Sequence, residues 1–82
     1  MVVFVAPGPG SIAFVAGRRV GGAVVRNRAR RILRAAWREF APRALEGTDV
    51  AFVARGSIRG AKTQDLVSEM QELLHRARVL RP

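Results

Sequence analysis

Three short stretches of the chain have the apolar pattern of β-strands. Residues 2–5 (VVFV) favour a strand, and the Pro-Gly-Pro-Gly sequence at positions 7–10 is typical of a turn. Residues 12–16 and 49–55 (DVAFVAR) have the same character, and small or apolar side chains on both faces of 12–16 indicate that at least one face is covered. The pattern therefore predicts a sheet of three strands.

Between the second and third strands, apolar residues recur at helical spacing from residue 23 to residue 40. The predicted helix ends before Pro42. Its core-facing stripe comprises Val25, Ala29, Ile32, Leu33, Ala36 and Phe40. Trp37 borders this stripe, and beyond it a row at i, i+4 spacing consists of Arg26, Arg30, Arg34 and Arg38.

A second helix is predicted to begin near Thr63, with Thr63 as its N-cap and Asp65 in its first turn. Its expected apolar face consists of Leu66, Met70, Leu73, Leu74 and Ala77. The element order is thus β-β-α-β-α, which predicts an α+β fold in the form of a small α/β sandwich. Residues 1–82 are enough for one domain with a single core.

The charge of the chain is distributed unevenly. The net charge is +9, fourteen of the fifteen cations are arginine, and Lys62 is the one lysine. Residues 1–38 hold eight arginines and no acid, whereas all six acids lie from Glu39 onward. A GC-rich genome explains arginine in place of lysine but not this clustering, so the distribution predicts nucleic-acid binding.

The basic helix carries charges that destabilise it when it is alone. Like charges at i, i+4 cost about 0.2–0.5 kcal/mol per pair, and the helix dipole disfavours cations near the N-terminal end. Bound phosphate would reverse each of these effects, and Gly21 and Gly22 let backbone N–H groups approach an anion there. Asn27 adds an uncharged donor and acceptor. A solvated basic face that only keeps the domain soluble is the less favoured alternative.

The stretch RRVGGAVVRNRARR, residues 18–31, resembles the signature of the bacterial ribonuclease P protein component. Arg26-Asn27-Arg28 matches the RNR core of that motif, and basic pairs flank it at positions 18–19 and 30–31. The strands and the last helix also fit, so the resemblance covers nearly the whole chain. It implies a ribosomal-protein-domain-2-like sandwich whose basic helix lies in a left-handed β-α-β crossover, although such connections are right-handed in about 98% of proteins.

The resemblance also implies a function in the cytoplasm. Proteins of this family pair with a catalytic RNA that uses magnesium, and they assist removal of the 5′ leader from precursor tRNA. The expected RNA-binding residues are Arg18, Arg19, Arg26, Asn27, Arg28, Arg30, Arg31 and Arg34. Phe4 and Arg19 are expected in a cleft for the single-stranded leader, with core packing as the alternative for Phe4.

One departure from the family concerns the N-terminal side. Family members usually carry a basic arm and an aromatic-bearing helix before the first strand, and we expect this chain to lack them. Two other functions are alternatives. A structural RNA-binding protein of ribosomal or chaperone type is the runner-up, and a DNA-binding protein ranks last because a helix-turn-helix needs a second adjacent helix.

The sequence offers no candidate for protein catalysis. His75 is the one histidine, without a partner at a metal-binding spacing, and there is no cysteine. Asp65, Glu69 and Glu72 share one side of the last helix, where a solvated acidic face is favoured over a metal site. We therefore expect no catalytic residue, no protein metal site and no membrane span, since no apolar run reaches the ~18–20 residues needed.

Overall fold

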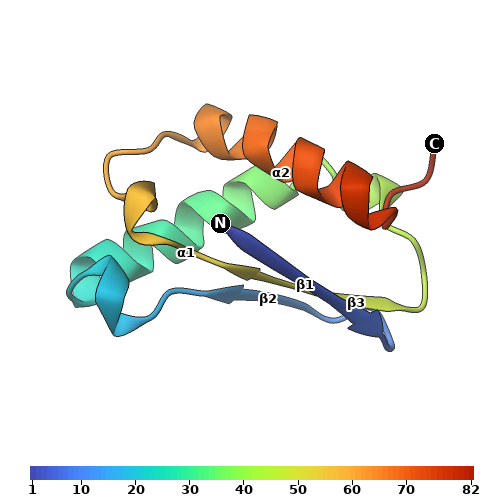
Figure 1. Ribbon diagram of the computed structural model, residues 1–82, viewed down its shortest axis with the longest axis horizontal. Helices are drawn as coiled ribbons and strands as arrows, with labels where there is room; N and C mark the ends of the chain where they lie inside the picture. Colours follow the sequence, from blue (N-terminus) through green and yellow to red (C-terminus); the bar gives the residue numbers. More distant parts are fainter.

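The computed structural model describes residues 1–82 and has two layers (Figure 1). A three-stranded sheet forms one layer, and helices α1 (Ala23–Trp37) and α2 (Thr63–Ala77) together cover one of its faces. The α+β fold and the predicted β-β-α-β-α order are confirmed. No helix has the length and apolar content that crossing a bilayer requires.

The sheet is built from strands β1 (Val2–Pro7), β2 (Ile12–Val15) and β3 (Thr48–Val53) in the order β1-β3-β2. Strand β3 pairs antiparallel with β1 and parallel with β2. The predicted end of β1 at residue 5 is two residues too early, because Pro7 still pairs with Thr48. Pro7 is tolerated there because β1 is an edge strand.

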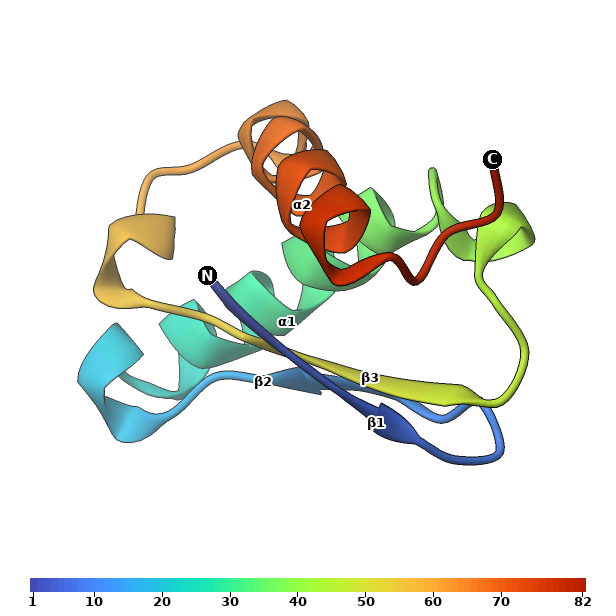
Figure 2. The same cartoon turned by 45° about the vertical axis from the view of Figure 1, so that its right-hand side comes forward.

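Helix α1 makes the connection from β2 to its parallel neighbour β3, and this crossover is left-handed. In both views β1 crosses in front of β3, so β2 lies behind β3 (Figures 1 and 2). Seen from the helix side with the parallel strands pointing up, β3 therefore lies to the left of β2. The structure confirms the exception to the right-handed rule that the resemblance implied.

Helix α1 ends at Trp37, three residues before the predicted end. After it the hydrogen bonds tighten from i−4 to i−3, with Glu39 N–H donating to Ala36 and Phe40 N–H to Trp37. This tightening precedes the 3₁₀ turn η2 (Ala41–Arg43), where Pro42 could not continue an α-helix. Phe40 is still buried as predicted, but from the turn rather than from the helix.

Helix α2 differs from the prediction at both ends. Lys62 occupies the N-cap position instead of Thr63, and the Asp65 carboxylate accepts a hydrogen bond from the Lys62 backbone N–H at 2.9 Å. Ala77 is exposed rather than part of the apolar face. The chain turns at Arg78, whose φ of 57° is left-handed, and Val79 enters the core instead.

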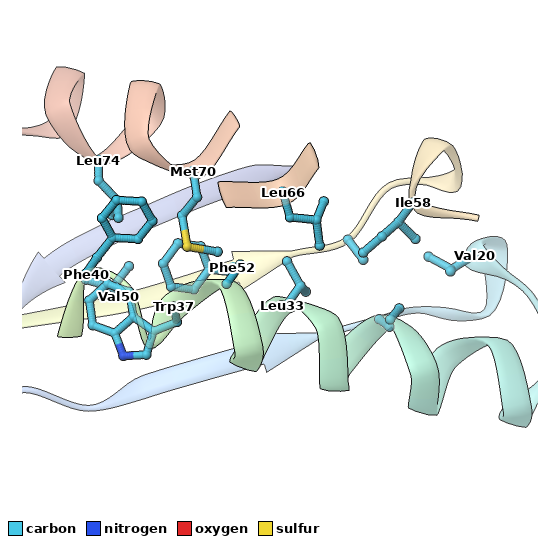
Figure 3. Close-up of a cluster of buried hydrophobic side chains, with 14 of the residues drawn as sticks. Val20, Leu33, Trp37, Phe40, Val50, Phe52, Ile58, Leu66, Met70 and Leu74 are labelled. Atoms are coloured by element: carbon cyan, nitrogen blue, oxygen red, sulfur yellow. The ribbon is translucent and has the colours of Figure 1, made fainter. Parts of the chain in front are cut away.

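The core lies between the helices and the sheet (Figure 3). Its fully buried large side chains are Leu33, Phe52, Met70 and Leu74, contributed by α1, β3 and α2. Trp37 is only 8% exposed and packs on Phe52 at 5.5 Å between ring centroids, so it belongs to the core rather than to its border. No polar or charged side chain is buried, so apolar burial at about 1.5–3 kcal/mol per large side chain holds the layers together.

Candidate RNA-binding surface

The predicted RNA-binding residues lie at one end of the molecule and along the polar face of α1. The 3₁₀ turn η1 (Arg18–Val20) places Arg18 and Arg19 in solvent directly before the helix. Asn27 and the arginines at 31 and 34 are exposed, whereas those at 26, 28 and 30 are half-buried. The structure thus brings the two basic pairs and the Arg-Asn-Arg core of the motif onto one continuous segment.

None of the eight arginines in residues 18–38 pairs with a carboxylate. The chain has two ion pairs, one between the Met1 amino group and Glu69 and one between Arg76 and Glu72 at 2.6 Å. Both lie outside the basic segment. The positive charge of this surface is therefore not neutralised within the protein, as a phosphate-binding surface requires.

The start of α1 is also open to an anion. Gly22 is the N-cap and supplies no side-chain hydrogen bond, and no acid lies in the first turn. The preceding Gly21 has φ 152°, and a Cβ there would approach the Val25 side chain to 3.0 Å. Glycine at 21 is therefore needed for the tight entry into the helix, and the helix N–H groups it leads to have no side-chain cap.

Within the row, two arginines are oriented by polar or aromatic neighbours. Arg30 donates to the side-chain oxygen of Asn27, one turn earlier on the same face. The Arg34 guanidinium lies 5.4 Å from the centre of the Phe14 ring on β2. Arg26 differs, because its Nε is buried and finds no acceptor in the protein. Of the row, Arg34 is thus the member that contacts the β2 edge of the sheet.

Arg28 lies on the other side of the helix and reaches the loop after β3. Its guanidinium donates to the backbone oxygen of Ala61 at 2.6 Å. This contact occupies one N–H donor of Arg28, the second arginine of the Arg-Asn-Arg motif, within the protein. A guanidinium has five N–H donors, so Arg28 keeps others for a ligand.

The second predicted feature, the leader cleft, lies on the sheet face that the helices leave uncovered. Phe4 pairs with Ala51 on this outer face and is 60% exposed, so the alternative that Phe4 packs in the core is wrong. A mainly apolar hollow of about 380 Å³ contains Phe4, Ala13 and Ala51. This face offers an aromatic ring and a flat apolar floor to an unpaired base.

Arg19 does not line the hollow that contains Phe4. It lies with Arg18 and Arg55 around a second hollow of about 340 Å³ at the carboxyl ends of β2 and β3. Val53 lines this second hollow and is two residues from Ala51, so it shares the outer face of β3. The two proposed cleft residues therefore lie at different points along one face rather than in a single pocket.

A further group of cations lies outside the predicted RNA-binding residues. Arg55, Arg59 and Lys62 are all exposed on the loop between β3 and α2. The signal was present in the sequence, because residues 50–64 contain no acid. It was weak beside the arginine-rich helix, and only the fold shows that this loop contacts η1.

The acidic residues of α2 make separate contacts. Asp65 accepts from the Lys62 backbone, Glu69 pairs with the Met1 amino group, and Glu72 pairs with Arg76. No three His, Asp or Glu side chains lie close enough together to hold a metal ion.

Together, the sandwich with its left-handed crossover and the unpaired arginine surface define a small basic α+β domain. The sequence pattern of the family described as Ribonuclease P matches residues 1–78. The chain is 40% identical over 72 residues to the ribonuclease P protein component of Symbiobacterium thermophilum, which covers 88% of this chain and 63% of the relative. The corresponding protein of Roseiflexus castenholzii is 41% identical over 68 residues, covering 82% and 56%.

Solved structures agree on the fold. The Staphylococcus aureus RNase P protein superimposes with a TM-score of 0.80 at 19% identity, covering 96% of this chain and 75% of that one. The Thermotoga maritima RNase P protein gives a TM-score of 0.73 at 20% identity, covering 90% and 74%. The chain belongs to the ribonuclease P protein family. It spans 63% or less of the length of these two curated relatives.

Proposed function

We propose that this chain acts as the protein subunit of ribonuclease P. It binds the catalytic RNA and precursor tRNA, and in the cytoplasm it assists endonucleolytic removal of the tRNA 5′ leader. The observation that carries the proposal is the arginine surface of η1 and α1, on which no guanidinium pairs with a carboxylate. Family membership over residues 1–78 supports the choice of RNA.

In this proposal the chemistry belongs to the RNA. The hydrolysis uses magnesium ions held by the catalytic RNA, and the protein contributes binding and orientation. The absence of a three-ligand acidic or histidine cluster in the chain is compatible with that division. Arg18, Arg19, Asn27 and the arginines at 26, 28, 30, 31 and 34 serve as RNA contacts, with the planar guanidinium forks suited to phosphate oxygens.

The leader is proposed to bind on the outer face of the sheet. The exposed Phe4 ring can stack one unpaired base, which is worth about 1–3 kcal/mol. Arg18 and Arg19, at the carboxyl ends of β2 and β3, would then contact the sugar-phosphate backbone of the same RNA leader farther along its length. Stacking tolerates any base, which suits leaders of varied sequence.

Reconstitution tests the proposal. The protein is added to a bacterial ribonuclease P RNA at low magnesium, and the cleavage rate of precursor tRNA is measured against RNA alone. We expect faster cleavage with the wild-type chain and little gain with Arg26→Gln/Arg30→Gln/Arg34→Gln. Tight RNA binding without any gain in cleavage would favour the structural RNA-binding alternative. No binding at all would overturn the proposal.

A further inference from the structure

The loop between β3 and α2 carries positive charge that the protein leaves unpaired. Arg55, Arg59 and Lys62 are exposed, and none of them is in either ion pair of the chain. The acids that flank the loop along the chain are Asp49 and Asp65, and both carboxylates accept hydrogen bonds from backbone N–H groups. The loop thus repeats, on a smaller scale, the uncompensated charge of the arginine helix.

The fold places this loop beside the arginine-rich motif of residues 18–31. In both views the 3₁₀ turn η3 (Gly56–Ile58), the turn η1 and the start of α1 gather at the same end of the molecule (Figures 1 and 2). The hydrogen bond from Arg28 to Ala61 ties the loop to the helix directly. Two segments that are about thirty residues apart in the sequence therefore form one positively charged end of the molecule.

The two sides of the loop differ in charge. On the side facing η1, the hollow that Arg55 shares with Arg18 and Arg19 is completed by glycines and apolar residues, without an acid. On the side facing α2, a second hollow lined by Arg55 and Arg59 also contains Asp65 and Glu69. An anion is therefore favoured on the η1 side, where three arginines are among the lining residues and no acid is.

We propose that the loop after β3 is a second RNA-contacting segment, in which Arg55 binds a backbone phosphate together with Arg18 and Arg19, and the exposed Arg59 binds a neighbouring phosphate. In this proposal Arg28 is the positioning residue that holds the loop against the helix. This inference rests on the proposed function and extends its RNA surface. The hollow of about 340 Å³ is the seat of one phosphate, and it joins the arginine helix to the outer sheet face.

The first test measures binding to a bacterial ribonuclease P RNA as a function of salt. Arg55→Gln/Arg59→Gln should weaken binding roughly tenfold near physiological salt and reduce the slope of log K against log salt by about two, one counterion per lost contact. The matched control is Arg76→Gln/Arg78→Gln, which removes the same charge from the opposite end of the molecule. The control should change neither quantity appreciably.

The outcomes separate this inference from the proposed function. If Arg26→Gln/Arg30→Gln/Arg34→Gln weakens binding but Arg55→Gln/Arg59→Gln behaves like the control, the loop is not an RNA contact and only the further inference fails. If neither set of substitutions weakens binding, the proposed RNA surface itself is wrong.

The second test addresses Arg28 in the free protein and in the complex. Without RNA, Arg28→Ala should speed hydrogen exchange at the Arg59 and Ala61 amides, which bond within the loop, whereas Arg31→Ala should not. In the complex, the losses of RNA-binding free energy caused by Arg28→Ala and Arg59→Gln should be less than additive. Once Arg28→Ala has displaced the loop, Arg59 no longer contacts the RNA, so removing it costs nothing more. Unchanged exchange together with full additivity would show that Arg28 does not position the loop.

Discussion

The guanidinium of Arg34 on α1 lies 5.4 Å from the centre of the Phe14 ring on β2, so this arginine packs against an edge strand of the sheet. Phe14 in turn stacks on Phe52 at 5.8 Å between centroids with an interplanar angle of 10°. The arginine row and the centre of the core are therefore linked through one aromatic side chain. The contact with Phe14 orients Arg34 on the fold, which pre-organises this arginine for a ligand.

Arg34→Gln should separate binding from stability. The substitution loses a cation–π contact worth about 0.5–1 kcal/mol, but it also relieves two like-charge pairs, with Arg30 and Arg38, of about 0.2–0.5 kcal/mol each. We expect the free energy of unfolding to change by less than about 0.5 kcal/mol while RNA affinity falls. Urea unfolding and filter binding measure the two quantities. Arg34→Lys keeps the charge and serves as the control, and an affinity equal to wild type for Arg34→Gln would remove Arg34 from the RNA surface.

Leu33→Ala should destabilise the protein without touching the RNA surface. Leu33 is fully buried in the core, so its truncation leaves a cavity that typically costs about 2–5 kcal/mol. The midpoint of urea unfolding reports the loss. Val24→Ala on the same helix is the control, because Val24 is 83% exposed and alanine favours the helix slightly. Equal stability of the two variants would contradict the assignment of the core face.

Gly8→Ala should disrupt the connection between β1 and β2. A Cβ at position 8 would lie 1.9 Å from a carboxylate oxygen of Asp49, and that carboxylate accepts from the backbone N–H groups of Gly10 and Ser11 at 2.9 and 2.8 Å. The substitution must displace Asp49 and leave these bonds unmade, at about 1–3 kcal/mol.

The control for Gly8→Ala is Gly56→Ala, where a Cβ meets nothing within 4 Å and φ is not positive. Thermal unfolding compares the two glycine variants. A melting temperature for Gly8→Ala that matches the Gly56→Ala value would mean that the turn accommodates the methyl group.

The helix faces and the element order could be predicted because they follow from local periodicity. The stripe through Leu33 and Ala36 is buried, and the order β-β-α-β-α is found. Element ends were less accurate, because they depend on contacts distant in sequence. Strand β1 continues to Pro7 only because Thr48 pairs with it, and Val79 replaces Ala77 in the core only because Arg78 turns the chain.

The candidate RNA surface could be predicted from the sequence only where its residues are contiguous. Arg18 to Arg34 form one sequence segment, so their clustering was visible without a structure. The loop with Arg55 and Arg59 lies next to these residues only because the β2-α1-β3 crossover brings the two segments together. No local sequence pattern encodes the handedness of that crossover. The strand pattern alone left the exposure of Phe4 open, because a strand that is apolar on both faces does not reveal which face the helices cover, and only the resemblance suggested a cleft position.

Phe4→Ala tests whether the outer face of the sheet binds the leader. Phe4 is 60% exposed and pairs with Ala51 through the backbone, so its removal should change the free energy of unfolding by less than about 1 kcal/mol. In the reconstituted enzyme it should weaken binding of precursor tRNA by about 1–3 kcal/mol, the value of one stacked base, and leave binding of leaderless tRNA unchanged. Phe4→Trp keeps an aromatic ring and should restore most of the affinity. An equal loss for both tRNAs would place the contact outside the leader, and no loss for either would mean that the outer face does not stack a base.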